Sequence, residues 1–104
     1  MKLTLYKVFG FDPDNEPSGW DIVSSVKVMT ENDLRQEFLW AYNNGGISND
    51  IIYDYSHNPD YKKENWDDIG SLSAATMVDI MNDLGNYNAS YWYVISETEI
   101  EIKG

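Results

Sequence analysis

The 104 residues contain no cysteine, which excludes disulfide bonds and thiolate chemistry. No apolar run approaches the roughly 20 residues that a membrane span needs. The opening segment MKLTLYKVFG also lacks the hydrophobic stretch of a signal peptide. These absences predict a cytoplasmic protein without a membrane partner.

Positive charge is scarce in this chain. Lys and Arg together number 7 against 18 Asp and Glu, which gives a formal net charge of −11. Because phosphate groups are bound by Lys and Arg, this composition argues against direct contact with nucleic acid. A negative excess steers cationic partners toward a protein, although it also serves solubility alone. We therefore expect the partner to be a basic protein surface.

Motifs of the common enzyme classes are missing as well. The sequence has neither a Gly-x-Ser-x-Gly elbow nor a phosphate-binding glycine loop. The single histidine, His57, lies in a polar turn and is expected to be solvated. The D-x-D-x-E run at residues 12–16 resembles the start of a calcium loop, but Pro17 and Val23 stand where such a loop needs Gly and Glu. We expect no catalysis, no metal and no cofactor.

The length favours one domain over residues 1–104. Alternating apolar residues predict strands over 2–9 and 20–29, and the turn-rich segment 10–19 joins them as an antiparallel pair. The alternation groups Leu3, Leu5 and Phe9 on one side of the first strand, and Trp20, Ile22, Val26 and Val28 on one side of the second.

Two amphipathic helices are expected. The first begins after Thr30, whose hydroxyl can accept from the amide of Asp33, and ends at the Asn-Asn-Gly-Gly run 43–46. The second covers about 73–84 and is capped by Ser71 or Ser73. Their apolar stripes consist of Leu34, Phe38 and Ala41 or Tyr42 in the first, and of Ala74, Met77, Val78, Met81 and Leu84 in the second.

The remaining segments complete the expected fold. Within residues 47–70, the run Ile51–Tyr55 favours a short strand, followed by a functional loop or an unrecognised element. Residues 90–96 are aromatic and β-branched, which predicts a central or well-packed strand. Residues 97–103 alternate, with Ile100 and Ile102 expected to face inward and Glu97, Glu99 and Glu101 outward. The order predicts an α+β fold, a small antiparallel sheet of about four strands with two amphipathic helices packed on one face.

The acidic residues suggest a binding surface. Glu97, Glu99 and Glu101 would form a row with a spacing of about 6.6–6.8 Å, comparable to the pitch of a nucleic-acid backbone. Protection of an edge strand by charge explains that row equally well. Further candidate contacts are the helical pair Asp79 and Asp83 and the preceding Asp67 and Asp68.

Aromatic residues lie among these acids, as they do in protein interfaces. Tyr61, Trp66 and Asp54 are the candidates in the central segment, and Trp40, outside the apolar stripe of its helix, is expected to be exposed.

In its size, acidity and lack of cysteine, the chain resembles the small inhibitors of defence nucleases that phages and plasmids encode, such as anti-CRISPR and anti-restriction proteins. Many of these mimic DNA, so the resemblance implies a protein that occupies the positively charged groove of a nuclease. Two alternatives remain open. One is an immunity protein against a cationic nuclease toxin, and the other is a small-ligand-binding protein or enzyme that uses the loop 47–70. The oligomeric state stays open too.

Overall fold

A computed structural model describes residues 2–11, 25–87 and 92–102. The predicted loop 10–19 falls mostly outside these ranges, as do the acidic run 12–16, the start of the predicted strand 20–29 and the start of 90–96. The main elements are the strands β1 (Lys2–Phe11), β2 (Ser25–Met29) and β3 (Trp92–Glu101), and the helices α1 (Glu31–Asn43), α2 (Asn49–Ser56) and α3 (Ala74–Asp83). Short 3-10 turns cover Pro59–Tyr61, Ile69–Ser71 and Leu84–Asn86.

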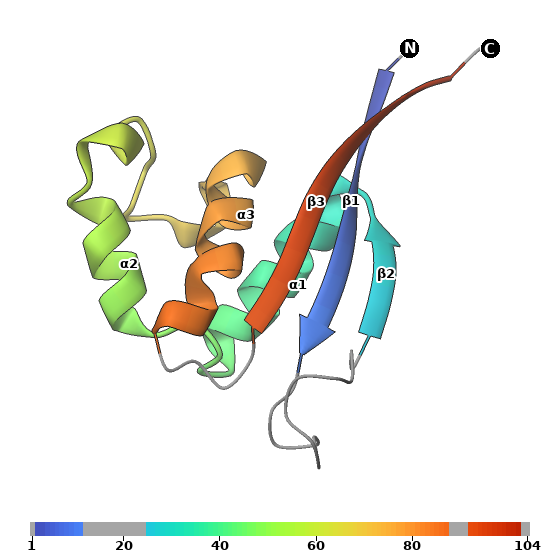
Figure 1. Ribbon diagram of the computed structural model, residues 1–104. Coiled ribbons are helices and arrows are strands. Elements are labelled where there is room, and N and C mark those ends of the chain that lie inside the picture. Colours follow the sequence, from blue (N-terminus) through green and yellow to red (C-terminus); the bar gives the residue numbers. More distant parts are fainter. Residues whose placement is uncertain (1, 12–24, 88–91, 103–104) are drawn as a thin grey trace.

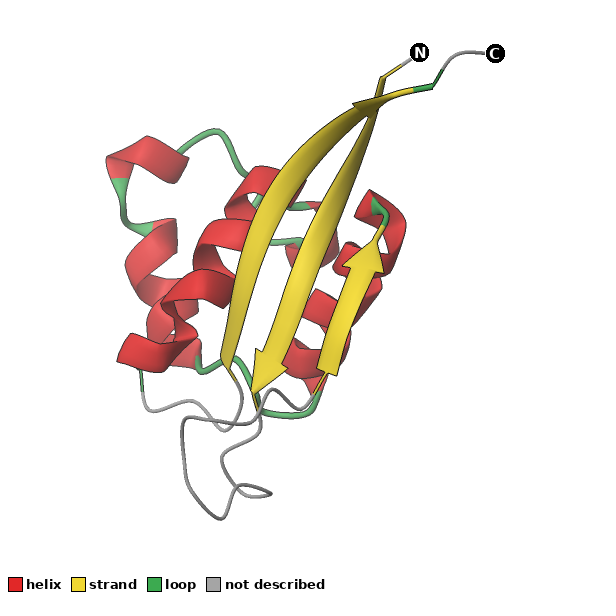
Figure 2. Cartoon of the chain, turned by 45° about the vertical axis from the view of Figure 1, so that its right-hand side comes forward, coloured by secondary structure: helices red, strands yellow, loops and turns green. Residues whose placement is uncertain are grey.

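The chain is an α+β protein with a small antiparallel sheet, as the sequence predicts. The described residues form three strands in the order β2-β1-β3, rather than about four (Figure 2). Long-range pairing joins the two ends of the chain, since Lys2 lies opposite Glu101 and Phe11 opposite Trp92. Within the segments 90–96 and 97–103, predicted as one or two strands, residues Trp92–Glu101 form the single continuous strand β3.

The helices lie on one side of the sheet and so cover one of its two faces. On the covered face, Tyr6 and Val8 of β1 and Tyr93 and Ile95 of β3 are buried. The helix α3 packs between β3 and α2, so that α2 lies farthest from the sheet (Figure 1). The buried side chains of sheet and helices together form a continuous apolar cluster.

The expected facing of several strand residues is wrong. Leu3, Leu5 and Phe9 do share one side of β1, but Tyr6 and Val8, on the opposite side, are the buried residues. Ile100 and Ile102, expected to face inward, are 39% and 38% exposed. Both faces of β1 carry apolar side chains, so alternation defines two sides without telling which one the helices cover.

The helix α1 forms where the sequence predicts it. The Thr30 hydroxyl accepts from the Asp33 amide at 3.3 Å, and the stripe of Leu34, Phe38 and Ala41 is buried. The helix ends where Gly45 adopts a φ of 79°, a conformation that residues with a side chain rarely take.

The helix α2 replaces the short strand predicted at residues 51–55. Ser48 caps it by accepting from the Ile51 amide at 3.4 Å. Ile51 is buried, and Ile52 and Tyr55 pack partly buried against the core. These three positions follow a helical period, which here overrides the strand preference of isoleucine and tyrosine. The described ranges therefore hold three α-helices instead of two.

The helix α3 begins after the predicted cap Ser73, which accepts from the Thr76 amide at 3.3 Å. Near its end, the Asn82 side chain binds the backbone of β3 from the side. Its Oδ1 accepts from the Ile95 amide at 2.8 Å, and its Nδ2 donates to the Ile95 carbonyl at 3.2 Å. This pair of hydrogen bonds fixes α3 against the free edge of β3.

Arg35 connects α1 to the segment that precedes α3. Its Nη1 donates to the carbonyl oxygens of Gly70 at 2.8 Å and Leu72 at 2.6 Å. The one arginine of the sequence is therefore bound within the fold. Of the helices described, none has both the length and the apolar character needed to cross a bilayer.

Candidate acidic interaction surface

Three aspartates of the helical layer each accept a hydrogen bond from a tyrosine hydroxyl. The bonds run from Tyr55 to Asp83 at 3.0 Å, from Tyr61 to Asp79 at 2.8 Å and from Tyr87 to Asp54 at 2.8 Å. These six residues, named here the tyrosine–aspartate cluster, come from α2, α3 and the turns that follow each helix. The cluster brings together four predicted site residues, namely Asp54, Tyr61, Asp79 and Asp83.

The cluster borders an open, polar cleft of about 410 Å³. Its lining consists of Tyr55, Tyr61, Asp79, Asn82 and Asp83. The rings of Tyr55 and Tyr61 meet with centroids 4.8 Å apart, and the Trp66 indole donates to the Tyr61 carbonyl at 3.0 Å. Trp66, also a predicted contact residue, is therefore a partly buried side chain that packs against the core and binds the backbone of Tyr61.

The tyrosine hydroxyls keep their protons over the physiological range. The hydrogen bond to Asp79, together with partial burial, raises the pKa of Tyr61 to about 12. Burial, and then the hydrogen bond to Asp83, raises the pKa of Tyr55 well above its ordinary value. The hydrogen bond to Asp54 likewise raises the pKa of Tyr87. Each hydroxyl remains a donor, which orients the carboxylate that it binds.

The concentration of negative charge extends beyond the six residues. The charges of Asp60 and Asp83 add to that of Asp79 in raising the pKa of Tyr61. The charges of Asp83 and Asp50 do the same for Tyr87. Since such effects need proximity, five aspartates lie around these tyrosines, on α2, on α3 and on the turn after α2.

The predicted glutamate row forms a second acidic surface. Glu97, Glu99 and Glu101 alternate along β3 and are exposed. The alternation that includes the buried Tyr93 and Ile95 places the row on the helix-bearing face. The carboxylates stay in solvent at the end of the strand pair that carries the chain termini (Figure 1). Their cross-strand neighbours on β1 are Tyr6, Thr4 and Lys2, in that order.

Asp67 and Asp68 are exposed on the segment between the helices α2 and α3. Neither belongs to the tyrosine–aspartate cluster, and the Asp68 carbonyl accepts from the Ser71 amide and hydroxyl. Trp40, expected to be exposed, is 48% exposed.

His57 caps the end of α2. Its ring stacks on Tyr53 at 4.1 Å, and its Nδ1 lies 2.9 Å from the Tyr53 carbonyl. The Ser56 hydroxyl, 3.0 Å from the same nitrogen, donates to that carbonyl at 2.8 Å. Both side chains therefore bind the last turn of α2. The described residues include no group of three or more His, Asp or Glu side chains placed to hold a metal ion.

Sequence reasoning missed Tyr55, Tyr87 and Asn82. The partners of the two tyrosines, Asp83 and Asp54, lie 28 and 33 residues away, so only the tertiary fold reveals these pairs.

The fold and this surface define an acidic α+β protein whose aspartates are oriented by tyrosine hydroxyls. No protein-family model, curated protein or solved structure matches the chain.

Proposed function

We propose that this protein is an inhibitor that binds the positively charged, nucleic-acid-binding groove of a nuclease or defence complex in the bacterial cytoplasm. The observation that carries the proposal is the tyrosine–aspartate cluster. Its three carboxylates are held at defined positions on one surface, where a basic groove would meet them together.

The arrangement favours binding over mere solubility for a physical reason. A carboxylate already oriented by a hydroxyl loses less side-chain freedom on binding than a freely rotating one. Asp54 and Asp79 are exposed, so they remain accessible to Lys or Arg side chains while they accept from tyrosine. The net charge of −11 and the glutamate row would accelerate encounter with a basic partner, and salt would weaken that effect.

A nuclease panel tests the proposal. Plasmid cleavage by restriction nucleases, RNA-guided nucleases and a cationic toxin nuclease is measured with increasing amounts of the protein. The expected result is stoichiometric inhibition of at least one enzyme, relieved by added salt. Inhibition of the toxin alone would identify an immunity protein. If none of the enzymes is inhibited, the proposal is refuted.

A charge-neutral variant connects inhibition to the cluster. The substitutions D54N, D79N and D83N remove three charges but retain oxygen acceptors for the tyrosines. Each lost charge-assisted contact should weaken inhibition about tenfold. The matched control E31Q/D67N/D68N removes the same charge from exposed positions elsewhere and should change inhibition by less than about threefold per lost charge, through steering alone. Equal losses in both variants would contradict a role for the cluster.

A further inference from the structure

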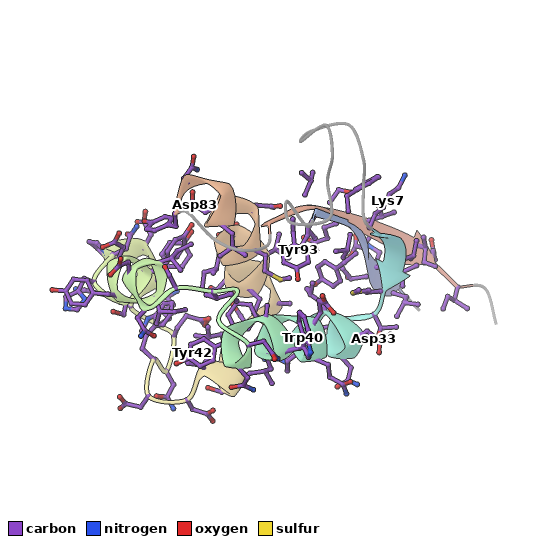
Figure 3. The ribbon with its side chains drawn as sticks, turned by 90° about the horizontal axis from the view of Figure 1, so that it is seen from below. Lys7, Asp33, Trp40, Tyr42, Asp83 and Tyr93 are labelled. Carbon is purple, nitrogen blue, oxygen red and sulfur yellow. The ribbon has the colours of Figure 1, made fainter. Side chains whose placement is uncertain are left out.

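A second surface lies on the other side of the molecule, between the helix α1 and the outer edge of β2. It is an open groove of about 610 Å³, lined by Val28, Met29, Asp33, Gln36, Glu37 and Trp40. In Figure 3, Asp33 and Trp40 lie along α1, well apart from Asp83 on α3. The groove shares no residue with the tyrosine–aspartate cluster, so a ligand bound here would be independent of the proposed nuclease inhibition.

The edge of β2 offers backbone groups to an added strand. Ile95 directs its amide and carbonyl to Asn82, away from β1. Bonding alternates along an antiparallel pair, so Val8, opposite Ile95, directs its own groups to β2. The same alternation turns the amide and carbonyl of Val28 to the outer edge. No described strand pairs there, and Val28 is 65% exposed.

The helix supplies side chains that suit a cation. Asp33 and Glu37 lie one turn apart on α1, about 6 Å from each other. The Tyr93 hydroxyl donates to Glu37 Oε1 at 3.0 Å and so orients this carboxylate. The next turn places Trp40, 48% exposed, in the same groove. Two carboxylates beside an indole ring match a guanidinium group, which forms paired hydrogen bonds and also stacks on aromatic rings.

The dimensions fit an extended chain. From Asp33 to Trp40 the helix rises about 10 Å, the length of about three residues of a β-strand. An added strand would therefore direct two successive inward side chains at this part of α1, about 6.6–6.8 Å apart.

We propose that this groove binds an extended segment of a partner protein. The segment adds to β2 as a further strand and places an arginine against Asp33, Glu37 and Trp40. Charge selects this occupant over a second copy of the chain. Two copies with a net charge of −11 each would repel, and the one arginine of the sequence is bound to the Gly70 and Leu72 carbonyls.

The test uses a fluorescently labelled peptide, Thr-Val-Thr-Arg-Thr-Val-Thr, whose valines and arginine would face α1. Binding is followed by anisotropy and by amide chemical shifts. The peptide should perturb Val28, Met29 and the Trp40 indole. Methylation of the two threonine nitrogens beside the arginine removes strand pairing but no side chain, and it should weaken binding at least tenfold.

Charge is tested separately. A peptide with citrulline in place of arginine keeps the shape without the charge and should bind about tenfold more weakly. The variant D33N/E37Q should also bind the arginine peptide about tenfold more weakly than the parent protein does. Its affinity for the citrulline peptide should change little. The control D67N/D68N should keep the full difference in affinity between the arginine and citrulline peptides.

Several results would overturn the inference. These are no binding of the arginine peptide, equal binding of its methylated form, or shifts that map to α2 and α3 instead. A self-associated protein in sedimentation, with an interface at β2 that the peptide does not dissociate, would also overturn it. None of these outcomes bears on the nuclease panel, which reports on the opposite surface.

Discussion

Replacement of Asn82 by alanine should destabilise the fold more than the position of this exposed residue suggests. The substitution removes both hydrogen bonds to the Ile95 backbone, at 2.8 and 3.2 Å. Ile95 is only 6% exposed, so water replaces the lost partners poorly. At about 1 kcal/mol for each bond, the unfolding free energy should fall by about 2 kcal/mol. For a domain of this size, that loss lowers Tm by roughly 8–16 °C.

Urea denaturation and thermal melts followed by circular dichroism measure this change. Amide exchange adds a local readout, since the Ile95 amide should lose protection beyond what the global destabilisation explains. The control N32A removes an exposed asparagine from the first turn of α1 and should stay within about 0.5 kcal/mol of the parent protein. If N82A matches this control, or if the Ile95 amide stays protected, the Asn82 side chain does not fix β3.

Three further predictions concern the rest of the fold. R35M should lower the unfolding free energy by about 3 kcal/mol, and R35K by less, because two carbonyls lose a charged donor; a urea midpoint equal to that of the parent protein would contradict this. G45A should cost about 1 kcal/mol and G45N less, since the φ of 79° suits glycine and tolerates asparagine, and the same titration compares them. Tyr61, with a pKa of about 12 against the ordinary 10.0, should stabilise the fold below about pH 10 and lose this contribution as the pH rises toward 12. The difference in absorbance at 295 nm between the parent protein and Y61F should therefore titrate near pH 12, and a midpoint near 10 would refute the hydrogen bond to Asp79.

The helix boundaries followed from the sequence because their causes are local. Thr30 and Ser73 each cap a helix through an amide three residues ahead, and Gly45 ends α1 through its own backbone conformation. The strand predicted at Ile51–Tyr55 failed because its isoleucines and tyrosines suit both structures. Only the cap at Ser48 and the packing of Ile51 against the core select the helix.

The candidate site was predictable only in part, as a set of carboxylates with Tyr61 and Trp66 among them. Charge counting found Asp54, Asp79 and Asp83, but the pairing of these aspartates with Tyr87, Tyr61 and Tyr55 depends on how α2 packs against α3. The glutamate row followed from alternation along β3. Its position on the helix-bearing face did not, because both faces of the sheet carry apolar side chains and alternation does not tell which face the helices cover.

Arg35 binds within the fold, and this limits the contacts that the protein can form with a partner. Its guanidinium is bound to two carbonyls, and the sequence holds no second arginine that could form a bidentate contact with a phosphate or carboxylate. Bidentate contacts at its surface must therefore be donated by the other molecule. A partner that presents only lysines would form such contacts poorly, which makes the arginine content of a candidate partner a criterion for selecting it.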